Sequence, residues 1–364
     1  MDMKIKELCE YGNKSIIKAG EGLNKGKYLF FTSSSVCNKY LENYQFNKPG
    51  IIMGTGGNAT LHYCDKNYSV STDCIVLFPN DNLNCKYLFY FFKKNMNILE
   101  AGFKGAGLRH TSKKYIDDIE IDNIPNLFEQ KKNVSVLDKI LSIIEKRKIQ
   151  IDKLDNLIKS RFVEMFGDPV INPRNWEMVE LSELADIKIG PFGTLLHKED
   201  YISEGHPLVN PSHIIDGKIC YDIKLTVSDE KYEELEPYIL RKGDLILGRR
   251  GEMGRCAVVN EEGLLCGTGS LIIRSKGEIS ADIMQKIISF PSYKKTIEDK
   301  AVGQTMPNLN VPIVSRFLIP RIPGEVQEEY FQFVQQVDKL KVEAQKSLDE
   351  MQVLFDSLMQ KYFG

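Results

Sequence analysis

Two long amphipathic stretches dominate the hydrophobic pattern of this chain. Between residues 129 and 166 there is no proline or glycine, and apolar residues recur at intervals of three, four and seven. The apolar positions there are Leu137, Leu141, Ile144, Ile151, Leu154, Ile158, Phe162 and Met165. After Gly324 a second stretch has apolar positions Val326, Tyr330, Phe333, Val337, Leu340, Ala344, Met351, Leu354, Leu358 and Tyr362. The spacing predicts two helices of the coiled-coil type, the first about 57 Å long at about 1.5 Å per residue.

Neither apolar stripe is expected to stay in water. Burial of one leucine-sized side chain contributes roughly 1.5–3 kcal/mol, so a row of exposed ones would be strongly unfavourable. The nearest partner for each helix is the other helix, and we expect an antiparallel pair that relates the two halves of the chain by a pseudo-twofold axis. The alternative is that each helix packs back onto its own globular domain.

The remaining sequence alternates short strand patterns with shorter helices. The first part has strand-like runs, a buried helical segment and a returning strand, in that order: 27–31, 50–53, 74–78, 86–99 and 116–124. The second part repeats this mixture with strands at 187–189, 208–210, 244–247, 257–259 and 270–273, and with helices at 281–288 and 293–300. Both parts are therefore predicted to be mixed α/β domains.

Several short segments occur twice at a nearly constant offset. Segment 48–54 matches 242–248, segment 105–107 matches 303–305, and Phe166-Gly167 matches Phe363-Gly364. The fold class predicted is α+β, with two mixed domains in pseudo-twofold tandem repeat, separated by two long antiparallel coiled-coil helices. The predicted segments are domain 1 at 1–126, spacer helix 1 at 127–170, domain 2 at 171–324 and spacer helix 2 at 325–364.

Bulk composition favours a soluble cytoplasmic protein. Of 364 residues, 42% are hydrophobic and 27% charged, and no apolar run reaches the roughly 20 residues that span a bilayer. The eight cysteines form no C-x-x-C pair, so buried free thiols are expected rather than a metal site. The net charge of −2 is unusual for a nucleic-acid binder, although an average hides local clusters.

Motifs of common DNA-acting enzymes are missing from the sequence. Gly26-Lys27 and Gly217-Lys218 lack the remainder of a P-loop, and neither Asn172-Pro173 nor Asn210-Pro211 continues into the tetrapeptide of adenine methyltransferases. The Pro-Asp dipeptide of many metal-dependent nucleases does not occur. We therefore expect no catalytic residues, no metal and no cofactor in this chain.

Two pairs of loops have the side chains of a recognition surface. Arg249, Arg250 and Arg255 lie on a glycine-rich turn, and arginine is the usual bidentate partner of guanine and phosphate. The matching turn in the first half has the uncharged Thr55, Asn58 and Thr60, which can read base edges through hydrogen bonds. A solvated charged hairpin is the alternative for the arginine turn.

The second pair of loops is rich in hydrogen-bonding groups. It comprises Lys104, Arg109 and His110 in the first half and Gln304, Thr305 and Asn308 in the second. We predict that all twelve residues contact DNA, although an ordinary exposed loop would have a similar composition.

These features together resemble the specificity subunits of type I restriction-modification systems, over the whole chain. The resemblance is carried by the order of domain, helix, domain, helix and by short signatures: Lys242-Gly243-Asp244-Leu245-Ile246 before a Gly-Arg turn, Gly303-Gln304-Thr305 with Asn308-Leu309, Ile319-Pro320 with Ile322-Pro323, and Phe166-Gly167-Asp168-Pro169 before Trp176. The first half departs from the pattern, with Gly107-Leu108-Arg109 where the second has Thr305-Met306-Pro307.

The resemblance implies a non-catalytic subunit that reads a bipartite site in double-stranded DNA, one half per domain. It further implies two methyltransferase subunits that carry S-adenosylmethionine and methylate adenine, and restriction subunits that use ATP and Mg²⁺. Two other interpretations stay open at this point. The chain could be the recognition part of a fused restriction-methylation enzyme, or a coiled-coil adaptor that binds protein rather than DNA.

Overall fold

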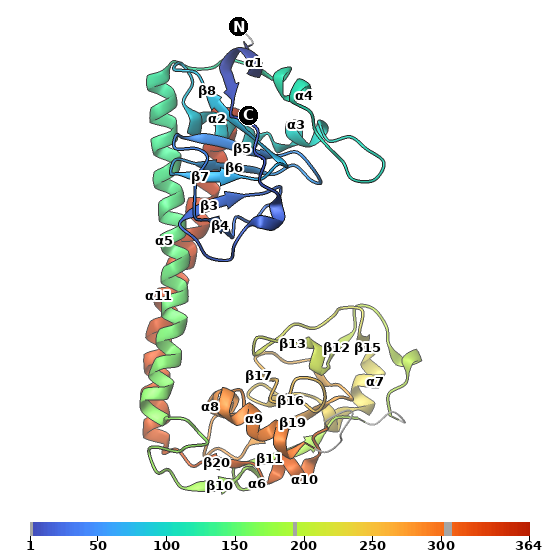
Figure 1. The fold of residues 1–364 in the computed structure, drawn as a ribbon. Coiled ribbons are helices and arrows are strands. Elements are labelled where there is room, and N and C mark those ends of the chain that lie inside the picture. The colour runs from blue at the N-terminus through green and yellow to red at the C-terminus, as the bar shows by residue number, and fades with distance from the viewer. Residues whose placement is uncertain (1–2, 192–194, 302–307) are drawn as a thin grey trace. The chain divides into compact units, whose positions relative to one another are not determined.

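The computed structural model describes residues 3–191, 195–301 and 308–364, and it divides the chain into two units. Unit 1 consists of Met1–Ile151 with Val342–Gly364, and unit 2 consists of Asp152–Lys341 (Figure 1). The four segments predicted from sequence separate helices from globular parts, whereas these units divide each long helix between them. The predicted segment bounds therefore stay a prediction.

Unit 1 is built on two small sheets. The four-stranded sheet has the order β2 (Cys9–Tyr11), β8 (Cys74–Pro79), β5 (Gly50–Gly54) and β6 (Leu61–Cys64), all antiparallel. The three-stranded sheet has the order β4 (Lys39–Leu41), β3 (Tyr28–Phe31) and β7 (Tyr68–Val70), in which β3 and β7 run parallel. A two-stranded ribbon joins β1 (Met3–Lys4) to β9 (Glu120–Ile121). The predicted strands at 27–31, 50–53 and 74–78 are confirmed.

Short helices complete unit 1. They are α1 (Ile5–Leu8), α2 (Cys85–Lys94), α3 (Met96–Ala101) and α4 (Lys113–Asp117), with a 3-10 turn at Ala19–Glu21. The single helix predicted over 86–99 is divided at Asn95, whose backbone leaves the helical region at φ −109° and ψ 44°. The strand predicted over 116–124 is confirmed only for β9, because Ile116 and Asp117 belong to the end of α4. Ser112 caps α4 by accepting a hydrogen bond from the Tyr115 amide, and only β9 pairs as a strand.

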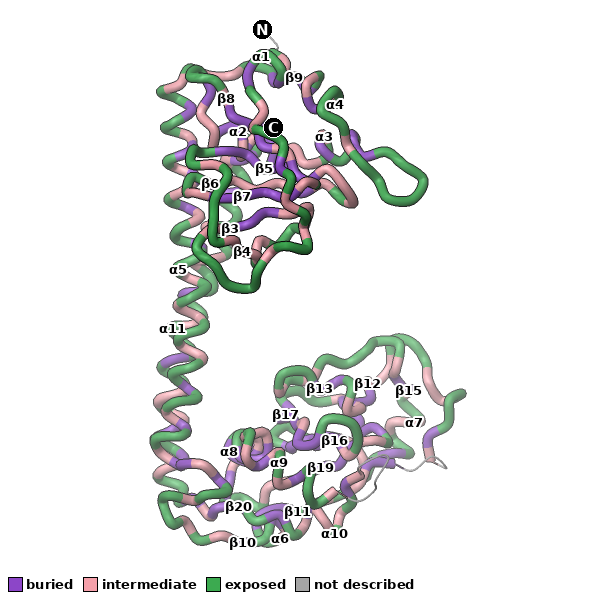
Figure 2. Tube along the Cα trace, in the orientation of Figure 1, coloured by how far each residue is buried: buried purple, intermediate pink, exposed green. Residues whose placement is uncertain are grey.

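The central strand β5 is buried on both faces, as is usual for a strand inside a covered sheet (Figure 2). Ile51 and Met53 face a core that includes α2, while Ile52 faces the second core, beneath the three-stranded sheet. This alternation follows from the two-residue period of a strand. It lets one short apolar run connect both cores of the unit.

Unit 2 repeats the same order of elements. Its four-stranded sheet is β11 (Ala185–Ile189), β19 (Ser270–Ser275), β16 (Leu245–Gly248) and β17 (Cys256–Val258), and its three-stranded sheet is β15 (Thr226–Val227), β12 (His206–Val209) and β18 (Leu265–Cys266). The ribbon is β10 (Met178–Glu180) with β20 (Leu318–Pro320). The helices α6 (Leu181–Leu184), α8 (Ala281–Ile288), α9 (Pro291–Lys300) and α10 (Val311–Ser315) match α1 to α4.

Some elements of unit 2 have no equivalent among the described elements of unit 1. They are the hairpin of β13 (Ile214–Ile215) with β14 (Lys218–Ile219), helix α7 (Asp229–Glu234), and 3-10 turns at Pro211–His213 and Glu236–Tyr238, whereas the 3-10 turn at Lys198–Asp200 matches the one at Ala19–Glu21. The strands and helices predicted for the second domain are all confirmed, to within a few residues at their ends.

The two long helices are α5 (Leu127–Phe166) and α11 (Gly324–Phe363), each of 40 residues. In unit 2, Asp155 of α5 bonds Lys341 of α11 at 2.5 Å and Arg161 bonds Glu329 at 2.7 Å. In unit 1, Arg147 Nε donates to Ser347 Oγ at 3.2 Å. As the residue number increases along α5, the number of its partner on α11 decreases, which confirms that the two helices are antiparallel.

The apolar seam, meaning the apolar positions predicted along the two long helices, is confirmed with two corrections. Leu340 and Leu354 of α11 are 50% and 42% exposed, so they do not belong to it. Phe355 and Met359 are buried instead, and they pack with Phe363 into the core of unit 1. A 3.6-residue helix places only one of two adjacent apolar residues on the buried face, and the sequence alone favoured Leu354 over Phe355.

All eight cysteines are free thiols, as expected, and five of them are buried. Burial raises the pKa of Cys9 and of Cys256 to about 12, so these thiols stay protonated and unreactive near neutral pH. Within the described ranges, no helix combines the length and apolar character needed to cross a membrane.

Candidate nucleic-acid interface

In each unit the turn after the central strand meets the loop before a short capped helix. In unit 1 the Thr111 amide donates to the Thr55 carbonyl at 3.1 Å, and in unit 2 the Leu309 amide donates to the Arg249 carbonyl at 3.0 Å. A second bond is also shared, because the amides of Thr55 and Arg249 donate to Asp73 and Gly269 at 2.8 and 2.9 Å. In unit 1 the two loop regions chosen from sequence therefore form one surface, and in unit 2 Arg249 and Leu309 share the same backbone framework.

The unit 1 surface is held by backbone bonds between its two loops. The Gly57 amide donates to the Arg109 carbonyl at 2.9 Å, and Gly56 pairs with His110. Gly57 has φ +86°, a conformation that favours glycine and lets this turn form between β5 and β6. The Thr55 hydroxyl donates to the Asp73 carbonyl at 2.9 Å, so this side chain is partly committed to the turn itself.

The second loop of unit 1 lies between α3 and α4 (Figure 1) and contains the basic residues Lys104, Arg109 and His110. Lys104 and His110 bond each other through both backbone groups at 3.0 Å, which closes a small hairpin, and both residues are exposed. Arg109 is also exposed and donates to the Asn58 side chain at 2.8 Å. Lys104, Asn58, Arg109 and His110 thus lie together and face solvent.

Thr60 does not belong to this surface. It is 8% exposed, and its hydroxyl accepts a hydrogen bond from the Gly54 amide at 3.2 Å. The side chain closes the β5–β6 turn from inside.

The three arginines of the unit 2 turn have three different environments. Arg249 Nε donates to the Leu309 carbonyl at 2.9 Å, and burial lowers the pKa of this guanidinium, with a further lowering by Arg250. Arg255 bonds Glu252 at 3.0 Å and the Pro211 carbonyl at 3.2 Å. Arg250 is exposed and forms no ion pair within the described part of the chain.

Glu252 connects Arg255 to the body of unit 2. It bonds Lys294 of α9 at 2.7 Å as well as Arg255, and the Lys294 hydrogen bond holds the pKa of this carboxyl below its usual value. Arg255 is therefore neutralised locally, whereas the charges of Arg249 and Arg250 are not.

The remaining predicted residues precede α10 in the sequence. Gln304 and Thr305 fall outside the described residues. Asn308 is described and half-buried, and its side-chain oxygen is buried without a hydrogen-bond partner among the described residues. Asn308 directly precedes Leu309, whose carbonyl accepts the hydrogen bond from Arg249 Nε.

Sequence reasoning missed a pocket beside the unit 1 surface. The pocket has a volume of about 250 Å³ and is lined by Thr55 and Thr111 together with Lys14 and Lys113. Lys113 Nζ lies 4.4 Å from the centre of the Tyr11 ring. Lys113 lies within the loop region predicted from sequence, which ran to Lys114, but Lys14 comes from a distant segment and has no local signal.

Comparison with known proteins explains the duplicated arrangement. The family model described as type I restriction modification DNA specificity domain matches residues 1–153 and again residues 173–350. The chain belongs to this family. Each match covers the globular part of one unit together with most of the long helix that follows it.

Two curated members of this family are similar over most of the chain. The MjaVIII specificity subunit of Methanocaldococcus jannaschii is 22% identical over 310 residues, which cover 80% of this chain and 72% of that protein. The EcoBI specificity subunit of Escherichia coli is 18% identical over 364 residues, covering 91% and 76%.

Solved structures show the same fold. The S subunit of a type I restriction-modification system from M. genitalium aligns with a TM-score of 0.66 at 18% identity, covering 100% of this chain and 96% of that one. A chain from a study of complex assembly and conformational transition of the type I R-M system aligns with a TM-score of 0.61 at 16% identity, covering 100% and 97%. The predicted fold class, two mixed domains in tandem with long antiparallel helices, is confirmed.

Proposed function

We propose that this chain is the non-catalytic specificity subunit of a type I restriction-modification complex. Each unit reads one half of a bipartite site in double-stranded DNA, and the long helices set the length of the unread spacer. The cofactors S-adenosylmethionine, ATP and Mg²⁺ belong to partner subunits in this proposal. Two methyltransferase subunits and the restriction subunits assemble on this chain.

The observation that carries the proposal is that the two units share backbone hydrogen bonds between their loops but expose different side chains on them. Both units hold their two loops together through the same backbone bond, from Thr111 to Thr55 and from Leu309 to Arg249. At the tips, unit 1 presents Asn58 and Arg109, whereas unit 2 presents Arg249 and Arg250. A common scaffold with different hydrogen-bonding groups is what two modules need to read two different sequences.

The near-neutral net charge of −2 is compatible with this role. Lys104, Arg109 and Arg250 are exposed cations of the surfaces described above, and the methyltransferase subunits supply further phosphate contacts in the assembled complex.

The decisive experiment is methylation sequencing of DNA from cells that express this chain with its methyltransferase subunit. We expect methylated adenines within one bipartite motif that has a fixed gap, and no methylation when either chain is expressed alone. Purified complex should bind duplexes that contain the motif, with an affinity that falls steeply as salt rises. Absence of salt-sensitive, sequence-selective binding would leave the coiled-coil adaptor as the better interpretation.

A further inference from the structure

A buried glutamine occupies the same position at the start of each long helix. Gln130 is the fourth residue of α5 and Gln327 the fourth residue of α11. Their exposed fractions are 0% and 5%, which is unusual for so polar a side chain. Neither belongs to the recognition surfaces.

Each glutamine makes the same three hydrogen bonds. Gln130 Oε1 accepts from the Asn84 amide at 2.7 Å, and its Nε2 donates to the carbonyls of Asn82 and Pro125 at 3.1 and 2.8 Å. Gln327 Oε1 accepts from the Ser280 amide at 3.0 Å, and its Nε2 donates to the carbonyls of Glu278 and Ile322 at 2.9 and 2.8 Å. Only an amide can accept from one N–H and donate to two carbonyls, so the chemistry requires glutamine at both sites.

The partners show what the glutamines hold together. Asn84 and Ser280 are the N-cap residues of α2 and α8, which pack against the four-stranded sheet of their own unit. Pro125 and Ile322 lie in the segment that enters the long helix. Each glutamine thus fixes the first turn of a long helix to the domain before it and to the chain that leads into it.

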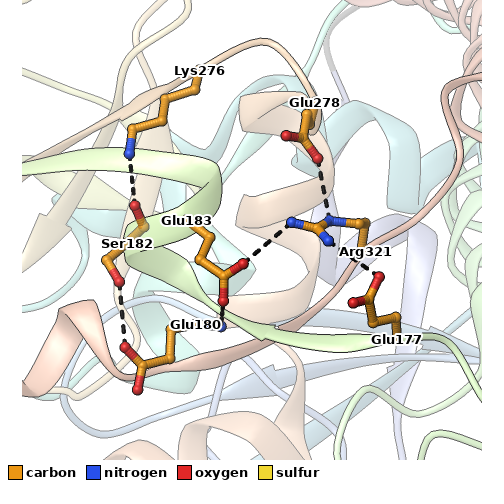
Figure 3. Close-up of polar contacts among 7 residues, drawn as sticks. All are labelled: Glu177, Glu180, Ser182, Glu183, Lys276, Glu278 and Arg321. Atoms are coloured by element: carbon orange, nitrogen blue, oxygen red, sulfur yellow. Dashed lines mark hydrogen bonds and ion pairs between the residues drawn. The ribbon is translucent and has the colours of Figure 1, made fainter.

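In unit 2 an ion-pair network surrounds the same joint (Figure 3). Arg321, next to Ile322, lies 3.1 Å from Glu177, 3.3 Å from Glu183 and 3.2 Å from Glu278. Glu278 also supplies a carbonyl to Gln327. Arg321 donates a hydrogen bond to Glu177, which raises the pKa of its guanidinium.

We propose that Gln130 and Gln327 are positioning residues that fix the direction in which each recognition domain projects from its long helix. They thereby restrict the spacer between the two half-sites to a single length, an inference that rests on the proposed function. A buried amide with three bonds permits one orientation of the helix start, whereas an apolar side chain of equal size leaves three polar groups unpaired and lets the joint shift.

The test replaces both glutamines by leucine in the complete methylating complex and records all methylated sites. We expect methylation at spacers one base pair longer or shorter to rise about tenfold relative to the parent, which corresponds to about 1.4 kcal/mol of lost discrimination. The two half-site sequences should not change, because the reading loops are untouched. If the leucine variant does not assemble, Gln130→Asn with Gln327→Asn replaces it. Asparagine keeps the amide but is one methylene shorter, and the same rise of methylation at altered spacers is expected.

Two controls separate positioning from stability. Gln352→Leu changes an exposed glutamine of α11 and should keep the parental spacer. Ile52→Ala empties part of the second core of unit 1, so it lowers stability without touching either joint. If the joint variants keep a single spacer as strictly as the parent, the glutamines only stabilise the fold and the proposal is overturned. If the parent itself shows no bipartite motif, the proposed function fails instead.

Discussion

Side chains of one type have different roles within a single turn of this protein. Arg249, Arg250 and Arg255 are separated by a few residues, yet one is anchored to the Leu309 carbonyl, one is exposed and one is paired with Glu252. An arginine held by one N–H keeps its remaining donors in a fixed plane, and this reduces the entropy lost when it binds a base edge. We therefore expect Arg249 to contact a base and Arg255 to stabilise the turn.

The first prediction follows from these environments. Arg249→Ala and Arg250→Ala should each alter only the half-site read by unit 2, and Arg249→Ala should weaken discrimination at one position by about 1–3 kcal/mol. Methylation sequencing of the variant complexes measures both effects. The matched control is Arg109→Ala, which should alter only the other half-site. Equal relaxation of both halves by the unit 2 variants would identify these arginines as general phosphate contacts.

The sequence was informative about loops and uninformative about individual atoms. Repeat alignment correctly paired the turn after residue 54 with the turn after residue 248, because glycines and apolar strand residues mark such turns. It did not distinguish Arg249 from Arg250, since that difference depends on the carbonyl of Leu309, 60 residues away. Gln130 gave no signal either, because its partners Asn82 and Asn84 are 48 and 46 residues away.

At the scale of elements, the first half of α5 is attached to α2 by polar as well as apolar contacts. Asp138 of α5 accepts from the Tyr90 hydroxyl at 2.5 Å and pairs with Lys86 at 2.9 Å. Burial, together with the hydrogen bond to Asp138, raises the pKa of Tyr90, so the hydroxyl stays protonated and keeps donating. The apolar contacts on the same face come from Leu137, Ile140 and Ile144.

We expect Asp138→Ala to loosen the contact between these two helices. A hydrogen bond to a charged group contributes about 1.5–3 kcal/mol, and partial exposure reduces this to an expected loss of about 1–2 kcal/mol in unit 1. Hydrogen exchange of peptides from α2 measures the local loss of protection. Asp152→Ala on the exposed side of α5 is the matched control and should leave exchange unchanged. Equal exchange in both variants would show that apolar packing alone holds α2.

Helices and central strands were predictable because burial imposes a period on their sequence. The errors occurred where a polar side chain changed the local backbone. Asn95 ends α2 by donating to the Phe91 carbonyl, which divides the predicted helix, and Ser112 caps α4, whose last residues occupy the start of the predicted strand. In the seam, Leu354 and Phe355 are adjacent and both apolar, and only packing decides which is buried.

At the scale of the molecule, duplication is the property that connects sequence, fold and family. The offset between equivalent segments is nearly constant, since few residues were inserted apart from the β13–β14 hairpin and α7. Each long helix also ends on a buried phenylalanine, Phe166 in the core of unit 2 and Phe363 in the core of unit 1. The ring centres of Phe166 and Tyr330 are 5.2 Å apart in unit 2, and those of Phe363 and Tyr87 are 4.9 Å apart in unit 1.

The last prediction concerns the continuous helices α5 and α11 as the determinant of spacer length. Insertion of four residues after Lys148 in α5, with four after Gln345 on the paired part of α11, preserves the antiparallel contacts on either side. Four helical residues add about 6 Å, close to two base pairs at roughly 3.4 Å each. Methylation sequencing should then report the same two half-sites with a gap longer by about two base pairs.

The helix insertion differs from the glutamine variants in a way that one sequencing experiment can detect. Lengthened helices with intact joints should move the spacer to a new single value, whereas loosened joints should broaden it around the old value. A matched insertion of four residues after Glu261, in the exposed turn between β17 and β18 of unit 2, adds chain without lengthening either helix, so it should leave the gap unchanged. An unchanged gap in the helix insertion would mean that partner subunits, and not α5 and α11, determine the distance between the half-sites.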